Sequence, residues 1–296
     1  MANIETMTKR RYTAGASRRR YRKEVNRASW LIGICAVIFV VGILVPSNCS
    51  SVRSVTDVGG DSLSLSAREL ERVVTNPSLD QTLVRYTGMT VSFNPQLHVP
   101  NWVAYELTAA ETYGEEPRAK SFMIDPDVDG CASPSDYRNT GFDRGHMAPA
   151  ADMKWDPEAM RESFYMTNIA PQDNRLNRGA WGKLEDKCRQ RARRDSAVII
   201  ISGPVLTDEI EMYIGDTGVA VPSRFFKVIL SPYTTPPTAI GFIMPNGNVP
   251  GGMQTCAVSV DEVEAITGHD FFSALPDDIE TEVESQKNFN RWSRMN

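Results

Sequence analysis

The feature that most limits how this chain can fold is a stretch without any charged residue between Arg27 and Arg53. Its first part, residues 30–45, is sixteen residues of strongly apolar character. The segment before it, residues 1–29, carries nine Lys and Arg against two Glu. Positive charge ahead of an apolar run is typical of a membrane orientation signal. We therefore predict a basic cytoplasmic segment over residues 1–29 and a transmembrane anchor over residues 30–46, with the membrane as a partner.

The alternative for this segment is the apolar core of a cleaved signal peptide. The run is long for such a core and no Ala-x-Ala cleavage site follows it, so we favour the anchor. Both interpretations place the rest of the chain outside the cytoplasm, either anchored in the membrane or secreted. Cys49, Cys131, Cys188 and Cys256 would lie in the exported part, where a disulfide is compatible with the compartment but no pairing is indicated.

The remaining sequence predicts one folded domain with a linker before it. Residues 47–67 contain Ser and Gly with little apolar periodicity, as a flexible tether would. Residues 68–285 carry the patterned sequence of a folded domain, and residues 286–296 have the character of a frayed tail. Apolar residues make up 41% of the chain, which is enough for one well-buried core.

Strands and helices are mixed along this domain without a regular repeat. Alternating or apolar runs predict strands over residues 83–93, 101–108, 197–202, 224–230 and 239–244. Helical periodicity and capping residues predict helices over residues 157–163, 181–193 and 260–267, the last capped by Ser259 or Asp261. Strands grouped around a few helices indicate an α+β fold.

The charge of the chain is unevenly distributed. The whole chain carries −5, the first 29 residues about +7, and the remainder is therefore near −12. An acidic body is unfavourable for binding a polyanion, which depends mainly on Lys and Arg. Residues 175–194 are the exception, with a net charge of +6. We interpret the distal Arg191, Arg193 and Arg194 of this window as a solvated helix face.

His146 is the histidine with the most informative neighbours of the three in the chain. It ends the segment Asp143-Arg144-Gly145-His146, in which the glycine allows close backbone approach. Hydrolysis of a phosphodiester needs a base of near-neutral pKa and positive charge on the phosphate. His146 and Arg144 offer these two groups side by side.

A second cluster runs from Asn168 to Arg189 and contains Asn177. If a helix begins near Asn177, then Trp181, Leu184 and Cys188 form an apolar stripe directed at the core. Asn177 falls within this stripe, while Glu185 lies along its edge. An inward amide needs a partner, such as an oxygen-seeking metal ion. The spacing equally allows Asn177 to be a helix N-cap.

Together these segments resemble the signature of the DNA/RNA non-specific endonuclease family. The matching segments are residues 142–149, 167–172 and 176–185, supported by residues 101–105, 221–227 and 260–268. The resemblance extends over roughly residues 80–280, and the joint order and spacing of the segments make it specific. It implies an α+β fold with a largely antiparallel central sheet flanked by helices, and a ββα-metal finger that carries the histidine and the metal ligand.

The resemblance also implies roles for individual residues. His146 matches the general base, Asn177 the protein ligand of Mg²⁺, and Glu185 a carboxylate that orients metal-bound water. Asn168 matches an asparagine that supports the histidine region. Arg144 and Arg189 match arginines at the site, and Arg118 matches an arginine that steadies the transition state, with Lys120 as its rival. Arg175, Arg178 and Lys183 surround the helix as candidate phosphate contacts.

We therefore predict a metal-dependent nuclease that cleaves DNA and RNA without sequence specificity, with Mg²⁺ as cofactor and Mn²⁺ as a substitute. The alternative is a catalytically silent nucleic-acid-binding or DNA-uptake protein on the same fold. The joint presence of His146, Asn177 and Glu185 argues against this alternative. Nucleic acid and the membrane are the predicted partners; no protein partner is evident, and a homodimer is left open.

Overall fold

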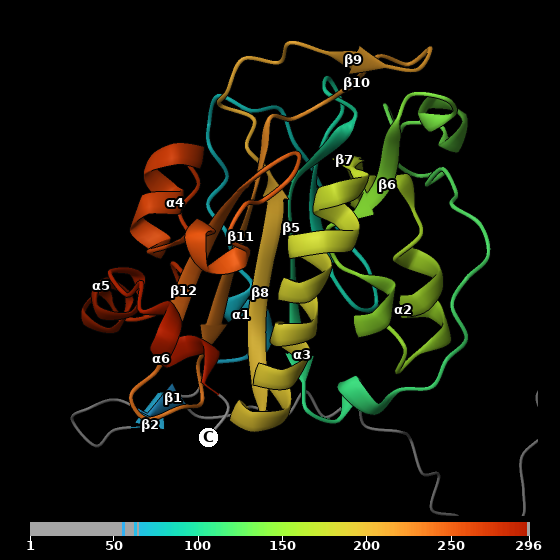
Figure 1. Cartoon of the computed structure of the whole chain (residues 1–296). Coiled ribbons are helices and arrows are strands. Elements are labelled where there is room, and N and C mark those ends of the chain that lie inside the picture. Colours follow the sequence, from blue (N-terminus) through green and yellow to red (C-terminus); the bar gives the residue numbers. More distant parts are fainter. Residues whose placement is uncertain (1–54, 57–61, 64, 295–296) are drawn as a thin grey trace, which may run out of the picture. The chain divides into compact units, whose positions relative to one another are not determined.

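A seven-stranded antiparallel sheet organises the folded part of the chain (Figure 1). The computed structural model describes residues 55–56, 62–63 and 65–294, all of which belong to one unit, Cys49–Asn296. The strand order is β13-β12-β11-β8-β5-β4-β3, and every neighbouring pair is antiparallel. The strands are β3 (Thr82–Arg85), β4 (Thr90–Asn94), β5 (Val99–Thr108), β8 (Ala197–Pro204), β11 (Arg224–Ser231), β12 (Thr238–Pro245) and β13 (Ala257–Val258). The predicted α+β class with a central antiparallel sheet is confirmed.

The sheet separates two apolar cores because successive side chains of a strand point to opposite faces. In β8, Val198 and Ile200 enter one core, whereas Ile199 and Ile201 enter the other. All four side chains are fully buried. The central strands therefore read as continuous apolar runs, which is what a sheet covered on both faces requires.

Different helices cover the two faces of the sheet (Figure 1). Helix α3 (Gly182–Asp195) buries Leu184, Cys188 and Ala192 in the first core. Helices α4 (Val260–Thr267) and α5 (Asp277–Glu284) bury Val263 and Val283 in the second. The other helices are α1 (Ala67–Leu70), α2 (Pro157–Glu162) and α6 (Phe289–Ser293).

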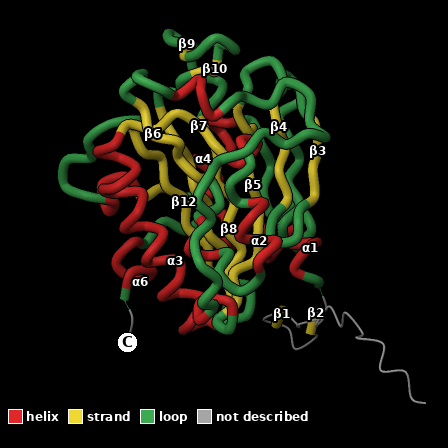
Figure 2. The backbone as a smooth tube through the Cα atoms, turned by 90° about the vertical axis from the view of Figure 1, so that its right-hand side faces the viewer, coloured by secondary structure: helices red, strands yellow, loops and turns green. Residues whose placement is uncertain are grey.

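A separate two-stranded ribbon precedes α3. Strand β6 (Phe142–His146) pairs antiparallel with β7 (Ile169–Asp173), and the chain then enters a π-helical turn, η5 (Leu176–Trp181), that is kinked at Gly179 and leads into α3. In both views the ribbon lies near the start of α3 (Figures 1 and 2). Two strands followed by a helix form the ββα arrangement that the resemblance implied.

Local sequence signals placed several elements correctly. Helix α4 has the predicted bounds, and Ser259 rather than Asp261 caps it by accepting a hydrogen bond from the Glu262 amide. The helix ends at Gly268, whose φ of 70° suits a residue without a side chain. The predicted strand over residues 83–93 is in fact two strands, β3 and β4, joined by a turn.

The prediction of a frayed tail at the C-terminal end of the chain needs correction. The predicted frayed tail contains α6, whose Trp292 is only 4% exposed and packs in the first core. An aromatic side chain of this size stabilises the end of the chain by burial.

The structure does not describe most of the N-terminal segments predicted above. These are the basic segment, the apolar run and most of the tether. Within the tether, β1 (Val55–Thr56) pairs with β2 (Ser62–Leu63).

Among the residues that the structure describes, no helix combines the length and the apolar character needed to cross a bilayer. Cys131, Cys188 and Cys256 are free thiols. Cys188 is buried in the first core, where it acts as a small apolar side chain.

Candidate active site

Gly145 lets the two strands of the ribbon approach closely. A Cβ atom at this position would lie 2.2 Å from the side-chain Oε1 of Gln172 on β7. Gln172 is itself fully buried, so it could not move aside without leaving its site. The glycine therefore allows His146 to be presented at the end of β6 by a tightly packed ribbon.

His146 is buried among aromatic rings at the end of β6. It is 8% exposed, and its ring centroid lies 5.2 Å from that of Phe122 and 5.0 Å from that of Phe164. Its Nε2 atom is buried and has no hydrogen-bond partner among the described residues. Burial, with a contribution from Arg118, lowers the pKa of His146 to about 3. The imidazole is therefore neutral at neutral pH and able to accept a proton.

The two arginines near His146 differ in how freely they can reach a ligand. Arg144 donates to the Pro134 carbonyl at 3.2 Å from Nε and lies over the rings of Phe122 and Tyr137. Arg118 is exposed, with its guanidinium carbon 4.9 Å from the centroid of Phe164. Arg144 thus supports the aromatic surroundings of the histidine, whereas Arg118 makes no hydrogen bond or ion pair with the described residues and lies exposed over Phe164.

Asn168 holds the backbone that follows His146. Its Oδ1 accepts from the Ala148 amide at 2.9 Å, and its Nδ2 donates to the carbonyls of Ala148 and Ser163 at 2.9 and 2.8 Å. The side chain is fully buried. With these bonds made, it acts on the position of the loop after His146 rather than on a ligand.

Asn177 lies in the π-helical turn and is not the N-cap of α3. Its Nδ2 donates to Asp143 Oδ2 at 2.9 Å, and Asn174 donates to the same oxygen at 3.1 Å. Arg178 approaches that oxygen at 3.5 Å. The carboxylate of Asp143 therefore orients the amide of Asn177. Among the described residues nothing hydrogen-bonds to Asn177 Oδ1, so the oxygen is available as a metal ligand.

Glu185 and Arg189 belong to a group of buried and half-buried side chains, four of them charged and one a tyrosine, which we call the α3 charge cluster: Tyr105, Asp152, Glu185, Arg189 and Lys227. Asp152 is fully buried and accepts from Arg189 at 2.6 Å and from the Tyr105 hydroxyl at 2.8 Å. Burial raises the pKa of Glu185 to about 7, opposed by the positive charge of Lys227 and reinforced by Asp152. The positive and negative side chains of this cluster balance one another.

Asp152 and Lys227 were not identified from the sequence. Lys227 occupies an inward position of β11, between Phe225 and Ile229, and its Nζ lies 4.4 Å from the centroid of Trp181 without a hydrogen-bond partner among the described residues. The sequence did contain a signal for Lys227: the lysine stands at a position of an alternating strand where the pattern predicts an inward-facing side chain. Asp152 offered no comparable pattern, because it lies in a short 3-10 turn, Ala150–Asp152.

In the structure, carboxylates neutralise part of the positive charge of residues 175–194. Arg175 is held by Asp173 at 2.7 Å, and Arg189 by Asp152 and Asp186. The interpretation of Arg191 as solvated is wrong: it is 3% exposed and pairs with Asp195 at 2.7 Å. Nearby carboxylates thus neutralise much of the positive charge of this segment. The buried Arg191 needs such a partner, because an unpaired buried charge is costly. Arg178 and Lys183 remain exposed at the start of α3.

The structure gathers the candidate residues into three neighbouring groups. His146, Arg118 and Arg144 share the rings of Phe122 and Phe164. Asn177 and Arg178 meet at Asp143, while Glu185 and Arg189 lie in the α3 charge cluster. Within the described part of the chain, no hydrogen bond or ion pair joins His146 directly to Asn177 or Glu185.

Known proteins match the part of the chain that contains these residues. A family model described as DNA/RNA non-specific endonuclease matches residues 66–278. The chain is 36% identical over 211 residues to the mitochondrial nuclease EXOG of Mus musculus, covering 64% of this chain and 57% of that protein. It is 31% identical over 226 residues to a nuclease of Nostoc sp., covering 70% of this chain and 79% of that protein. The chain thus spans less than two thirds of the EXOG protein.

A solved structure supports the fold. The crystal structure described as the EndoG/EndoGI complex superposes with a TM-score of 0.63 at 28% sequence identity, covering 67% of this chain and 88% of that chain. This agreement extends over most of the described residues.

The predicted localisation is contradicted. No helix in the described part of the chain could span a membrane, and the matched EXOG protein is named as mitochondrial. The predicted anchor, residues 30–46, lies outside the described residues.

Proposed function

The chain belongs to the DNA/RNA non-specific endonuclease family, and on this premise we propose that it hydrolyses phosphodiester bonds within DNA and RNA without reading their sequence. The observation that carries the proposal is the state of His146: a buried, neutral imidazole whose Nε2 has no protein partner among the described residues. Such a group can accept a proton from a water molecule. The proposed nuclease domain is residues 68–285, extended by α6.

In the proposed reaction a water molecule attacks the phosphorus atom, and His146 takes the proton that this water loses. The bond from phosphorus to one sugar oxygen breaks, and this leaving oxygen takes a proton from solvent, to which His146 later returns its own proton. Asn168 keeps the backbone after His146 in place through its three hydrogen bonds. The lowered pKa of His146 keeps the imidazole unprotonated over the neutral range, but it also makes the ring a weak base. In the proposed reaction the negative charge of the bound phosphate would raise this pKa and so allow the proton transfer.

Divalent-metal dependence comes with the family, and we propose Mg²⁺ as the ion, with Mn²⁺ as a substitute. Asn177 Oδ1 would hold it, since Asp143 binds the other side of this amide. Glu185 would orient a water molecule of the ion. When bound, Mg²⁺ supplies positive charge to the phosphate and the leaving oxygen. Oxygen ligands from an amide and from water suit a hard cation.

The arginines divide into supporting and substrate-facing residues. Arg144 and Arg189 are held by Pro134 and Asp152, and we propose that they position the site. Arg118 is exposed beside Phe164 and would stabilise the negative charge of the transition state. Arg175, Arg178 and Lys183 would contact the phosphate backbone, which carries no base identity and so gives low sequence specificity.

The test measures cleavage of supercoiled plasmid and of structured RNA by the full-length chain, with Mg²⁺, with Mn²⁺ and with chelator. We expect cleavage of both substrates only with metal, and a loss of about 10²–10⁴-fold in rate for His146→Ala. The matched control is His98→Asn, outside the ribbon, where asparagine suits the φ of 59°.

Intact substrates under every metal condition, with retained binding in a gel-shift assay, would instead support the silent binding protein. Full activity of His146→Ala would overturn the role of the histidine. Light scattering on the same preparation would measure whether the chain forms the homodimer that the sequence left open.

A further inference from the structure

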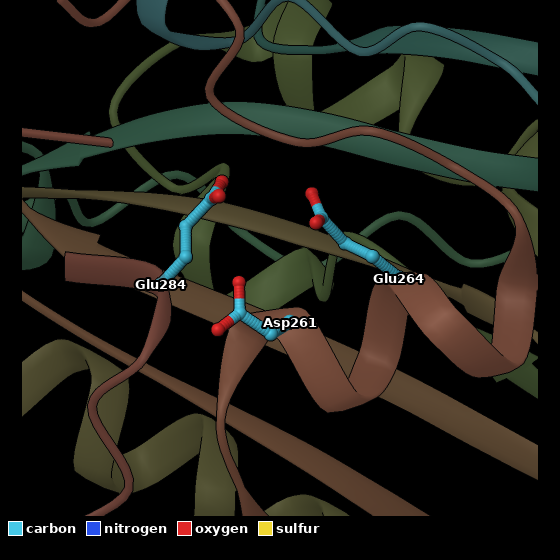
Figure 3. Close-up of side chains that lie close together, drawn as sticks. All are labelled: Asp261, Glu264 and Glu284. Carbon is cyan, nitrogen blue, oxygen red and sulfur yellow. The ribbon is translucent and has the colours of Figure 1, made fainter. Parts of the chain in front are cut away.

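Three carboxylates lie together on the face of the sheet opposite α3, and we call them the C-terminal acidic cluster: Asp261 and Glu264 on α4, and Glu284 at the end of α5. One oxygen from each lies within 4.8 Å of one from each of the others. Figure 3 shows the three carboxylates turned toward a common space between the two helices.

Glu284 is the informative member of the cluster. It is 6% exposed, and its Oε1 is buried without a hydrogen-bond partner among the described residues. A buried, unpartnered carboxylate oxygen is costly, because it has lost water without gaining another partner. It also ends α5, where the negative end of the helix dipole makes a further negative charge unfavourable.

Among the described residues, no positively charged side chain forms an ion pair with Asp261, Glu264 or Glu284. The charges that act on Glu284 come from Glu264, Glu280, Asp261 and Asp270, all of them acidic. The nearby Lys287 pairs instead with the exposed Glu262, at 3.4 Å. The Phe271 amide donates to Glu264 Oε1 at 2.8 Å, which fixes that side chain in the cluster. The arrangement therefore lacks a cation that the carboxylates could share.

The size of the cluster allows it to hold a calcium ion. Calcium binds oxygen at 2.3–2.6 Å, so two of its ligands can be up to about 5 Å apart. The three carboxylate oxygens all lie within 4.8 Å of one another, which is inside this limit. The exposed Asp261 leaves one side open to solvent, which can complete the coordination with water.

We propose that Asp261, Glu264 and Glu284 form a second divalent-cation site, which binds Ca²⁺, joins α4 to α5 and stabilises the C-terminal part of the domain. The site is independent of the proposed catalytic metal, because Asn177 and Glu185 belong to elements on the other face of the sheet. Its role is structural: the ion replaces mutual repulsion of the carboxylates with a shared contact.

The test is thermal unfolding of the chelator-treated full-length chain at pH 7.5, with and without Ca²⁺, together with calorimetric titration of the bound ion. At a Ca²⁺ concentration about 100-fold above Kd we expect Tm to rise by about 5 °C in the native chain and in Asn177→Ala. Glu284→Gln should lose this response, and so should Asp261→Asn, an exposed change that cannot disturb the core. Glu282→Gln is the matched control, because Glu282 is exposed and lies on α5 with Glu284. This variant should keep the rise of Tm with Ca²⁺.

Two results would overturn the site. One is a Ca²⁺ response of equal size in the native chain and in both cluster variants, which would place the ion elsewhere. The other is no change of Tm with Ca²⁺ in the native chain, together with a higher Tm in Glu284→Gln. This would mean that a proton on Glu284, without any metal ion, removes the repulsion between the carboxylates. Nuclease activity with Mg²⁺ is unaffected by Glu284→Gln in this proposal, so its failure and that of the proposed function are distinguishable.

Discussion

The α3 charge cluster and the C-terminal acidic cluster show two ways in which one sheet accommodates buried carboxylates on its opposite faces. On the α3 side, Asp152 and Glu185 lie with Arg189 and Lys227, and an ion pair at 2.6 Å satisfies Asp152. On the other side, Glu284 has the acidic groups Glu264, Glu280, Asp261 and Asp270 around it, and its Oε1 has no hydrogen-bond partner among the described residues. A balanced cluster can keep a carboxylate in place for chemistry, whereas an unbalanced one needs a proton or a metal ion.

The largest expected effect separates the two clusters by activity. Glu185→Gln should lower the cleavage rate by about 10²–10⁴-fold, because the amide keeps the shape but removes the charge that would orient water. Glu284→Gln, the same change in the other cluster, should leave the rate within about twofold. Plasmid cleavage under saturating Mg²⁺ measures both. Equal rates for the two variants would show that Glu185 has no part in the chemistry.

The second prediction concerns the balance of charge on the α3 side. Arg189→Met leaves the fully buried Asp152 without its ion-pair partner and should destabilise the fold by about 3–5 kcal/mol. Urea unfolding followed by circular dichroism measures the loss. Arg193→Met, exposed on the same helix, is the control and should cost less than about 1 kcal/mol. A small effect at Arg189 would mean that Asp152 is satisfied without it.

The third prediction concerns how stability depends on pH because of the excess of negative charge in the C-terminal acidic cluster. Burial and the neighbouring acids Glu264, Glu280, Asp261 and Asp270 raise the pKa of Glu284 to about 9. The folded chain therefore holds a proton that the unfolded chain has lost above pH 4.5, so stability falls as pH rises toward 9. In metal-free protein we expect up to ~2 kcal/mol of loss between pH 7 and pH 9. Urea unfolding at both values should show a flatter profile for Glu284→Gln; an unchanged slope would assign the titration to another group.

The smallest expected effect concerns the surfaces beside the two clusters. Arg178 is 75% exposed and has one contact with Asp143, at 3.5 Å. Arg178→Gln should weaken nucleic-acid binding severalfold and lower the slope of log K against log salt by about 0.7–0.9. Lys287→Gln, beside the C-terminal acidic cluster, should leave the slope unchanged. Fluorescence anisotropy with a labelled duplex at several salt concentrations would distinguish them.

Much of the fold could be predicted because local patterns decided it. Helix α4 has its predicted bounds, since Ser259 and Gly268 cap it within the segment itself. The π-helical turn around Asn177 was not predictable in this way. Asn177 could equally have been an N-cap on spacing alone, and its contact with Asp143, 34 residues earlier, resolves the question.

The sequence by itself determined the family, the set of central strands and the histidine that ends the Asp143–His146 segment. These depend on residue order and on alternation within short windows, and they are present before the chain folds. Only the tertiary structure decided which charges meet. Arg191 became buried, Lys227 entered the α3 charge cluster, and three acids from α4 and α5 came together. The physical reason is that desolvation and charge pairing depend on neighbours distant in sequence, which no local pattern specifies.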